Sequence, residues 1–403
     1  TSNDKNTYCY KTTDYGQTWT SIITDDVYGF ARSFQEDYVN PDLLFLGTEF
    51  GLYVTLNGGK NWVKFENNMP ATAIHYLEMH KRTNDLIMGT HGRGVIILDD
   101  VSPLRQITNE VVAKNLHFME TKAFEMGEES TFGGTSSETQ FVGRNPYDGA
   151  KVIYYLSKRH TFGKMKMRVL DSQGNFVTSL TPGKKKGINI VGWNFTSNVP
   201  VVAKGKTITF GGMVAPRVAA GTYKIVIEKG KDTYESTVEV KYDKNSVFTL
   251  AERKKQQDVV RKLYNMTEEL AFMVYQLDTY MEYGDKMVAS KPHLKKSVDN
   301  LKFEMNKLKE TLVITTGDNY VGSAENQLRE NMGDLYSTVA DYDGEPSSTQ
   351  MENLTKIEGE MEVARQSFES IKGKSLKKFL GALEKMELNG PTMKSYEEFV
   401  KKD

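Results

Sequence analysis

Cysteine is almost absent from this sequence of 403 residues, which contains a single one, Cys9. One thiol cannot form an intramolecular disulfide, so a small disulfide-stapled scaffold is excluded. The shortage does not separate a cytosolic protein from a periplasmic one, because exported proteins also fold without disulfides. Hydrophobic cores must therefore stabilise the chain, and its length allows two to four domains that each bury one.

Long apolar runs and an excess of one charge are missing as well. Nowhere do about 18 apolar residues follow one another, so we expect no transmembrane segment. The formal net charge is −1, with 52 Lys and Arg residues against 53 Asp and Glu residues. Because the basic residues are spread among acidic ones and form no stripe, we expect no nucleic-acid partner.

The common signatures of metal and cofactor sites are also lacking. Five histidines show no metal-ligand spacing to cysteine or carboxylates: His75, His80, His117, His160 and His293. The sequence has no phosphate-binding loop, no dinucleotide fingerprint and no Gly-Xaa-Ser-Xaa-Gly elbow. We therefore expect no metal and no cofactor.

What the sequence does contain is a repeat near its start. The segment TTDYGQTW at 12–19 recurs as TLNGGKNW at 55–62, which places Asp14 and Asn57 about 43 positions apart. The run LLFLGTEFGLYVT recurs as LIMGTHGRGVIILD about 42 positions later. A period of about 40 to 45 residues, made of short apolar runs and glycine turns, is typical of the four-stranded blades of a β-propeller.

The repeated motif has the chemistry of a tight hairpin turn. Asp14 or Asn57 can accept hydrogen bonds from backbone amides two residues on. Three glycines supply the positive φ angles that such a turn requires: Gly16, Gly58 and Gly59. Trp19 and Trp62 follow the turn, and we expect their rings to be buried between neighbouring sheets. The motif is therefore structural.

These residues resemble the Asp-box, or bacterial-neuraminidase (BNR) repeat, of sialidases, xyloglucanase-type hydrolases and sortilin-like propellers. The stretches GTEFGLYVTLNGGKNW and GTHGRGVIILDD are most similar to those of the bacterial sortilin-like or glycosyl-hydrolase-like proteins of the Bacteroidota. The resemblance implies a propeller closed by a THGRG blade, then an Ig-like module and a helical tail. It predicts the fold and says little about chemistry, because one fold hosts many functions.

Residues 1–110 are predicted to be the C-terminal blades of such a propeller. Segments 8–11 and 18–23 are expected to be the last two strands of one blade, 31–65 a full blade, and 74–100 most of another. Two and a half blades cannot close a ring, and their unpaired edges would aggregate. We therefore expect the remaining blades to come from an N-terminal segment absent from this sequence or from another chain.

The middle of the chain is predicted to be a linker or strap over 111–149, followed by an Ig-like β-sandwich over 150–245. An outer strand or a strap is expected across 104–112, and a loop over 124–144. Five strands with alternating patterning are expected in the sandwich: 151–156, 164–170, 187–193, 221–228 and 233–242.

A hairpin turn is predicted at 171–175, and Trp193 is the expected core aromatic of the sandwich. The order of its strands is similar to that of the Ig-like module of flagellar hook-capping proteins. That resemblance implies a spacer or a docking surface rather than a ligand site.

From Thr249 the apolar period changes from two to between three and four, and Thr249 with Glu252 predicts a capping box. Residues 246–403 are predicted to form an antiparallel bundle of about four helices, the first interrupted at Pro292. The first apolar stripe contains several methionines, which at this spacing are typical of core filler: Val259, Leu263, Met266, Leu270, Met273, Leu277 and Met281.

Four residues are candidates for a binding surface: Glu49, Phe50, His91 and Arg93. If each blade runs from inner to outer strand, their two turns join the second and third strands, at the end opposite to the Asp-box turns. A propeller binds partners at such a face. A structural alternative is that Arg93 bonds carbonyl groups to lock the ring while His91 caps a turn.

No catalytic residue is predicted. A retaining sialidase needs an arginine cluster with a tyrosine–glutamate pair, and most glycoside hydrolases need two carboxylates at a set separation. Glu49, Asp99 and Asp100 are the only carboxylates near the predicted loop ends. We expect Asp99 and Asp100 to end a strand and cap the following turn.

The predicted fold class is multidomain β plus α, with partial propeller blades, an Ig-like sandwich and a C-terminal helical bundle. We favour a non-catalytic binding or assembly protein of the periplasm or cell surface, whose partner is a protein or a glycan. Two alternatives stay open. One is a sialidase- or xyloglucanase-like glycoside hydrolase with its catalytic residues upstream of residue 1, and the other is a structural subunit of an outer-membrane complex.

Overall fold

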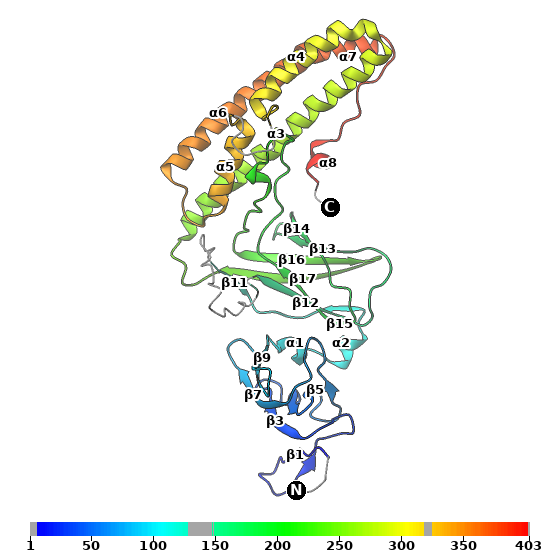
Figure 1. The fold of residues 1–403 in the computed structure, drawn as a ribbon, viewed down its shortest axis with the longest axis vertical. Helices are drawn as coiled ribbons and strands as arrows, with labels where there is room; N and C mark the ends of the chain where they lie inside the picture. Colours follow the sequence, from blue (N-terminus) through cyan, green and yellow to red (C-terminus); the bar gives the residue numbers. More distant parts are fainter. Residues whose placement is uncertain (1–5, 128–146, 148, 318–324, 402–403) are drawn as a thin grey trace. The chain divides into compact units, whose positions relative to one another are not determined.

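The computed structural model describes residues 6–127, 147, 149–317 and 325–401. Its architecture is mixed β and α, with several sheets followed by a C-terminal helical region (Figure 1). The described strands form five open sheets and close no barrel. The chain divides into two compact units, which are described separately: Thr1–Thr121 with Ile153–Phe162 and Gly183–Ile190, and Lys122–Val152 with Gly163–Pro182 and Val191–Asp403.

The first unit begins with three antiparallel sheets whose strands follow one another along the chain. The first is a short hairpin of β1 (Tyr10–Lys11) and β2 (Thr20–Ser21). The second has the order β3-β4-β5-β6: Ala31–Glu36, Leu44–Thr48, Gly51–Thr55 and Val63–Lys64. The third has the order β7-β8-β9: Ile74–His80, Asp85–Thr90 and Val95–Leu98.

The second and third sheets pack face to face through a shared apolar core. Alternation along each strand places one set of side chains in it: Leu43, Phe45, Leu52, Ile74, Leu77, Met79, Leu86, Met88 and Val101. The Ser33 hydroxyl of β3 also donates to the Ile74 carbonyl of β7, at 2.9 Å. Each sheet therefore buries one face against the other.

The other face of the second sheet is covered by the segment that precedes it. Trp62 is 3% exposed and packs in a cluster with Val27, Leu44 and Tyr53, to which Ile22 is added at the rim. Trp62 is buried as expected, although the segment that covers it around Ile22 is not a strand. The expectation for Trp19 was wrong, because its ring is 61% exposed and its Nε1 bonds only the nearby Gly16 carbonyl, at 3.2 Å. The segment around Ile22 covers the ring of Trp62, whereas no sheet of the described residues covers the ring of Trp19.

The two repeated turns have the same hydrogen-bond pattern. The Thr18 amide donates to the Asp14 carboxylate at 2.9 Å, and the Asn61 amide donates to the Asn57 side-chain oxygen at 3.0 Å. In each turn the first threonine hydroxyl donates to the same acidic or amide side chain, at 2.8 Å and 2.9 Å. The side chain of Asp14 or Asn57 therefore accepts from the backbone amide four residues later, whereas an amide two residues later was expected. An asparagine oxygen replaces a carboxylate oxygen without change of geometry.

Left-handed backbone angles close both turns as predicted. Gly16, Gly58 and Gly59 have φ angles of 88°, 69° and 92°. Tyr15 occupies the position of Gly58 with φ of 58°, which is uncommon for a residue with a Cβ atom. The Thr12 hydroxyl, which accepts from the Gly16 amide at 2.8 Å, and the Asp14 carboxylate hold this conformation.

Two short helices follow the third sheet, where an outer strand or a strap was expected across 104–112. They are α1 (Ser102–Arg105) and α2 (Asn109–Ala113). The strand prediction was wrong because two helix-start signals were overlooked. Pro103 lies in the first turn of α1, where a missing N–H costs nothing, and the Thr108 hydroxyl caps α2 by accepting from the Val111 amide.

Arg105 of α1 fastens the helix to both sheets. Its guanidinium makes a two-pronged pair with the Asp37 carboxylate, at 2.9 Å and 2.7 Å, and also donates to the Asn84 side-chain oxygen at 2.9 Å. Asp37 lies in the β3–β4 turn and Asn84 in the β7–β8 turn. Burial by itself lowers the pKa of Arg105, but the bonds to Asp37 outweigh that effect and raise it. The guanidinium therefore stays charged.

The sheets of the middle region contain all five expected strands and three further ones. A three-stranded sheet has the order β10-β12-β15: Leu116–Phe118, Ala150–Leu156 and Gly187–Trp193. A five-stranded sheet has the order β11-β17-β16-β13-β14: Phe124–Met126, Asp232–Tyr242, Gly221–Lys229, Met165–Leu170 and Phe176–Leu180. The predicted turn at 171–175 joins β13 to β14 through the Gly174 amide, which donates to the Asp171 carbonyl at 3.0 Å.

The expected linker contains the short strands β10 and β11. Residues 124–126 form strand β11, paired in parallel with β17, although a loop was expected there. Three residues are too few to show an alternation pattern, so their partner decides their conformation. The remainder of the predicted loop, 128–144, lies outside the described residues.

Trp193 is the buried aromatic that the sequence predicted. It is 1% exposed and packs edge-on against Tyr223 of β16, with 5.0 Å between ring centroids. Its Nε1 donates to the Thr196 carbonyl at 2.9 Å, so the polar end of the ring is satisfied inside the core.

The helical region begins at the predicted capping box, which the structure contains at Thr249 and Glu252. Its main helices are α3 (Leu250–Ser290), α4 (Lys295–Leu312), α5 (Leu328–Ala340) and α6 (Ser348–Ile371). After α6 a π-helical turn at Lys372–Leu376 leads into α7 (Lys377–Glu384), and α8 (Tyr396–Val400) comes last. All seven members of the predicted first stripe are buried. None of the helices within the described ranges is both long and apolar enough to cross a membrane.

The four predicted helices are present and lie in three rows, which are not all antiparallel. Along α3, the partner of Asp285 is Lys302 and the partner of Asp278 is Lys309, so α4 runs antiparallel to α3. In contrast, Lys262 pairs with Glu358 and Glu269 with Arg365, each 96 positions apart, so α6 runs parallel to α3.

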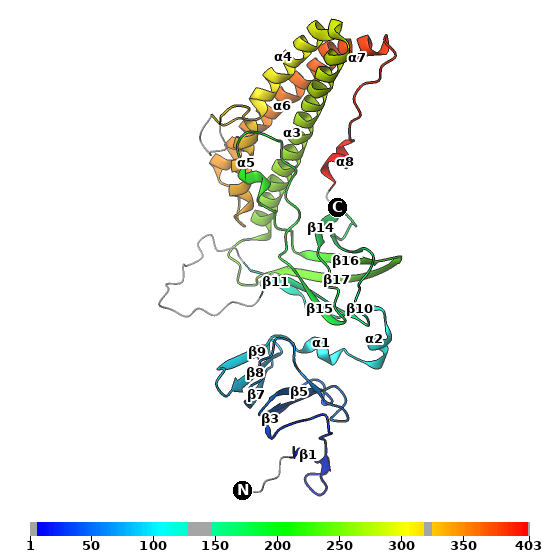
Figure 2. The same cartoon turned by 45° about the vertical axis from the view of Figure 1, so that its right-hand side comes forward.

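The second row consists of α4 and α5, which lie one after the other along α3 (Figure 2). The Gln256 side chain near the start of α3 donates to the Val339 carbonyl of α5, whereas α4 pairs with the end of α3. The 41 residues of α3 span about 60 Å, which is long enough for both. Apolar stripes predicted each helix but carried no information about which helix lies beside which.

The segment between β15 and β16 packs closely on α5. Arg329 is buried and donates to the Ala203 carbonyl at 2.9 Å and to the Thr207 hydroxyl at 2.7 Å, while pairing with Glu330. Gly211 and Gly333 approach so closely that a Cβ added to Gly211 would lie 2.8 Å from the Gly333 Cα. The sheet and the helices of this unit are thereby joined by a desolvated, hydrogen-bonded contact.

Candidate functional site

The four predicted binding residues lie at one end of the two stacked sheets. Glu49 and Phe50 form the β4–β5 turn, and His91 and Arg93 belong to the β8–β9 turn. Both turns join the second and third strands of their sheets. Thr48 pairs with Ala31, and Thr90 pairs with Ile74. The first residues of β3 and β7 therefore lie beside these turns. The Asp-box turn of the second sheet joins β5 to β6 and therefore lies at the opposite end.

Phe50 belongs to an exposed aromatic pair. Its ring stacks on Tyr28, with 5.0 Å between the centroids, and the two side chains are 40% and 67% exposed. Gly29 between the strands has φ of 94°, and a Cβ there would lie 2.6 Å from the Phe50 ring. The glycine is therefore required for the ring to pack where it does.

Glu49 faces an arginine from the neighbouring strand. The Arg32 guanidinium lies 3.7 Å from the Glu49 carboxylate, and the two side chains are 43% and 26% exposed. At that separation and exposure the pair adds little stability, so both groups remain available to a charged partner.

His91 is fixed by its backbone, and its ring is exposed. Its amide donates to the Ala73 carbonyl at 2.9 Å, and its carbonyl accepts from the Thr72 hydroxyl at 2.9 Å. The imidazole lies 5.8 Å, between centroids, from that of His75 on β7. Gly94, with φ of 65°, closes the turn by accepting from the Thr90 hydroxyl at 2.6 Å.

Arg93 projects from the tip of this turn and is exposed. In the part of the chain that the structure describes, its guanidinium makes no hydrogen bond or ion pair. The described residues also show no ring contact, hydrogen bond or ion pair between the β4–β5 turn and the β8–β9 turn. The four residues thus form two clusters at the same end of neighbouring sheets, and the cluster at 91–94 carries an unpaired positive charge.

Three members of this surface were not predicted: Tyr28, Arg32 and His75. Tyr28 precedes β3, Arg32 lies on β3 and His75 lies on β7, at the level of the turns that the sequence did single out. The signal available in the sequence was the pair of aromatic residues, Tyr28 and Phe30, on either side of Gly29. Strand pairing was needed to place them beside Phe50.

This surface combines aromatic, charged and imidazole side chains. It offers aromatic faces, a loosely paired carboxylate and guanidinium, two imidazoles and an unpaired arginine, which together suit a polar partner with some apolar area. Within the described ranges, no three His, Cys, Asp or Glu side chains are arranged to hold a metal ion. Asp100 accepts from the Ser102 amide at 3.1 Å, as expected of a residue that caps the next turn.

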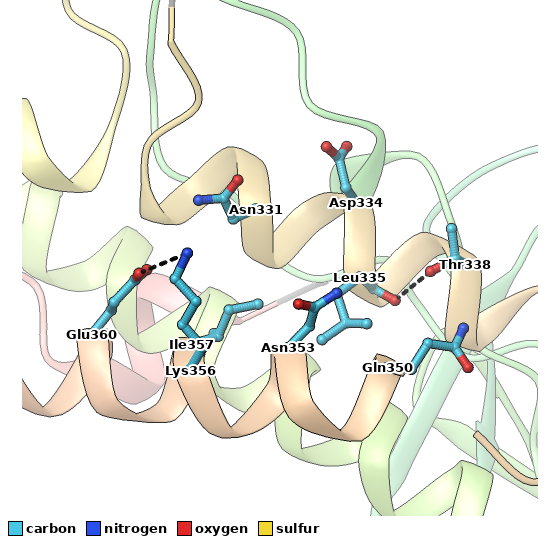
Figure 3. A pocket seen from close by; sticks show the side chains of 9 residues that line it. All are labelled: Asn331, Asp334, Leu335, Thr338, Gln350, Asn353, Lys356, Ile357 and Glu360. Atoms are coloured by element: carbon cyan, nitrogen blue, oxygen red, sulfur yellow. Dashed lines mark hydrogen bonds and ion pairs between the residues drawn. The ribbon is translucent and has the colours of Figure 1, made fainter. Parts of the chain in front are cut away.

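A separate pocket of about 310 Å³ lies between α5 and α6 (Figure 3). Leu335 and Ile357 extend into the space between the helices, whereas Asp334 turns away from α6. Lys356 pairs along its own helix with Glu360 at 3.8 Å. Burial, followed by the charge of Glu330, raises the pKa of Asp334. We assign no ligand to this pocket, because its charged groups are used in local contacts.

Comparison with known proteins gives little. No protein-family model and no curated protein matches the chain. Among solved structures, the chain is similar to the crystal structure of the extracellular domain of the putative one component system BT4673 from B. thetaiotaomicron, at 11% identity and a TM-score of 0.18. That match covers 57% of this chain and 28% of the other, so the chain spans well under half of its length.

Proposed function

We propose that the protein is a non-catalytic binding or assembly component of the periplasm or cell surface. In this proposal the sheets of residues 31–98 are consecutive blades of an Asp-box β-propeller of the sortilin-like type. The observation that carries the binding role is the exposed surface at one end of both sheets. There the Tyr28–Phe50 pair and the unpaired Arg93 are presented to solvent by turns that backbone bonds hold in place.

The stacking of the sheets supports the propeller. The second sheet is covered on both faces, by the hairpin segment around Ile22 and by the third sheet. Among the described residues, the third sheet is covered on one face only. Its other face exposes three apolar side chains, Tyr76 at 60%, Val95 at 67% and Ile97 at 54%, and β9 has no strand beyond it in the described residues.

A further antiparallel sheet with an apolar face is the partner that suits this open side, since like sheets already stack on each other here. It comes from another segment of a longer polypeptide or from another chain. Hydrogen exchange of β9 tests this point. Its amides should exchange more slowly in the longer polypeptide, or in a complex with the second chain, than in residues 1–403 alone. Equal rates would argue against an added sheet.

The middle sheets and the helices are assigned a supporting role in this proposal. Around Trp193 the strands form an Ig-like sandwich that acts as a spacer, and the helical region extends it. The bonds from Arg329 to Ala203 and Thr207 fix the helices to the sheet segment, as a rigid spacer requires.

The binding role is tested by a double substitution, Phe50→Ala with Arg93→Ala. The matched control is Tyr15→Ala with Lys60→Ala, which also removes one exposed aromatic and one exposed cation, but from the Asp-box turns. Tagged proteins are expressed in the native host, cross-linked and purified, and bound proteins are identified by mass spectrometry. A glycan array probes sugars in parallel.

We expect the Phe50 and Arg93 variant to lose its partner and the control to keep it. Retention of the same partner by both variants would reject the surface. Release of new reducing ends from array glycans by the unchanged protein would instead favour the glycoside hydrolase interpretation.

A further inference from the structure

A cavity with a mixed polar and apolar lining lies in the second unit. It encloses about 730 Å³, within the range of about 300 to 1,000 Å³ that is usual for small-molecule sites. One wall is the first third of α3, and the opposite wall is the β13–β14 turn with segments 197–198 and 216–219. Val400 and Lys401, at the end of α8, form a third wall. In both views α8 lies between α3 and the β14 side of the sheet (Figures 1 and 2).

Hydrogen bonds between neighbouring segments hold the walls in place. The Asn198 amide donates to the Val177 carbonyl at 3.3 Å, and its side-chain oxygen accepts from the Thr178 hydroxyl at 2.7 Å. On α3 the Gln257 side chain donates to the Tyr242 hydroxyl at 2.9 Å. These contacts orient the amide side chains before any ligand arrives, which reduces the entropy lost on binding.

The charges of the lining leave one cation without a partner. The lining contains four basic residues, Arg168, Arg217, Arg261 and Lys401, against two acidic ones, Asp171 and Glu268. Arg168 pairs with Glu228, and Arg217 pairs with Asp343 at 3.2 Å. Glu268 is buried and accepts from the Val201 amide at 3.1 Å. In the described residues, Arg261 makes no hydrogen bond or ion pair.

The positive charge of Arg261 affects the pKa values of two tyrosines that line the cavity with it. Burial raises the pKa of Tyr223 to about 12, and the charge of Arg261 opposes that rise. Burial likewise raises the pKa of Tyr264, again against the charge of Arg261. Arg261, Tyr223 and Tyr264 all line this cavity, and the N–H donors of the guanidinium remain available for an acid.

The remaining lining combines ring faces with amides. Tyr264 and Phe176 offer aromatic surface, while Asn198, Asn265 and Gln257 offer amides that both donate and accept. Sugar rings present apolar C–H faces and hydroxyl edges, and such a lining is complementary to both. An arginine beside it adds recognition of a carboxylate by two parallel hydrogen bonds.

We propose that this cavity binds a small carboxylated sugar, whose carboxylate is held by Arg261 and whose hydroxyls contact Asn198 and Asn265. The site is independent of the turn surface of the first unit. Its third wall is anchored by an aromatic cluster, in which Phe399 of α8 packs on Phe272 and Tyr275 of α3 at 5.4 Å and 5.0 Å.

The experiment uses the full chain and isothermal titration with glucuronate, with glucose as the neutral sugar of matched shape and inorganic sulfate as the plain anion. We expect glucuronate to bind at least tenfold more tightly than either. Arg261→Gln should weaken glucuronate binding at least tenfold and leave the weak glucose binding unchanged. Lys254→Gln, an exposed cation on the same helix, is the control and should bind like the wild type.

Asn265→Ala provides a second variant at an exposed position that packing does not need. It should weaken both sugars about threefold to tenfold, because a hydroxyl contact is lost in each. Absence of glucuronate binding at millimolar concentration would overturn the proposal. So would equal affinity for sulfate, which would identify a plain anion site, or unchanged glucuronate affinity in Arg261→Gln.

Discussion

The indole nitrogen of Trp62 donates a hydrogen bond to the carbonyl of Ile22, 2.7 Å away and 40 positions earlier in the chain. This bond ties the second sheet to the segment that covers it. The corresponding tryptophan of the first motif, Trp19, bonds only within its own turn. The same motif is therefore buried in one copy and exposed in the other, which makes the two copies a matched pair for experiment.

Trp62→Ala should destabilise the first unit by about 3–5 kcal/mol, because it leaves a cavity among Leu44, Leu46 and Tyr53. Trp19→Ala should change stability by no more than about 0.5 kcal/mol, since its ring is largely in water. Hydrogen exchange of the β4 and β5 amides measures both effects locally. A similar loss from both substitutions would contradict the packing described.

Asp14 should titrate far below an ordinary aspartate. Hydrogen bonds from the Thr18 side chain, then from its amide, lower the pKa of Asp14 from 3.8 to about 2. Because the folded pKa is the lower one, the stabilisation of the turn is fully present above about pH 4 and is lost as the pH falls through 2. The Thr18 amide resonance should follow that titration in an NMR pH series.

The second motif supplies the control for this titration. Asn57 accepts from the Asn61 amide in the same geometry but carries no ionisable proton, so the Asn61 resonance should stay constant between pH 4 and 2. Asn57→Asp should introduce a titration at Asn61 with a midpoint well below 3.8. A midpoint near the ordinary value would show that the turn does not hold the carboxylate.

Arg105→Ala should cost the first unit about 3–5 kcal/mol, because it leaves the fully buried Asp37 carboxylate without its counter-charge. Arg105→Lys should recover only part of this, since an ammonium group cannot make the two-pronged pair. Arg32→Ala removes an exposed partner of Glu49 and should cost at most about 1 kcal/mol. Urea denaturation with exchange mapping of residues 31–55 ranks the three variants.

Gly211→Ala should destabilise the second unit by about 1–3 kcal/mol, because its Cβ would meet the backbone of Gly333 in α5. Gly359→Ala should stabilise the same unit by about 0.5–1 kcal/mol, since it lies inside α6 with no heavy atom near the added Cβ. Far-UV circular dichroism at 222 nm during urea unfolding follows both. Equal effects in the same direction would refute the close approach.

Local signals carried most of the successful predictions. The capping box at Thr249, the hairpin turn at Asp171 and the buried stripe from Val259 to Met281 all depend on residues within a few positions of one another. Strand β15 was expected at the residues where it occurs, because alternation is strong there. Interactions between residues close together in the sequence therefore determine these features.

The failures concern elements whose partners are distant. Strand β11 exists because β17 pairs with it, and Trp19 is exposed because no sheet in the described part of the chain covers its hairpin. The helix α2 was missed for a different reason, since its Thr108 cap could have been recognised in the sequence. In the candidate site, the turns were found from the repeat, whereas Tyr28, Arg32 and His75 required knowledge of strand pairing.

Spacing and residue type alone determined where the turns, caps and apolar stripes of this protein lie, because hydrogen bonds within four or five residues and helical or strand periodicity decide them. Only the tertiary structure decided that α4 and α5 share one row, that α6 runs parallel to α3, and that Arg261 shares a cavity with Asn198. Those relationships depend on which apolar faces meet, and an apolar face by itself does not specify its partner.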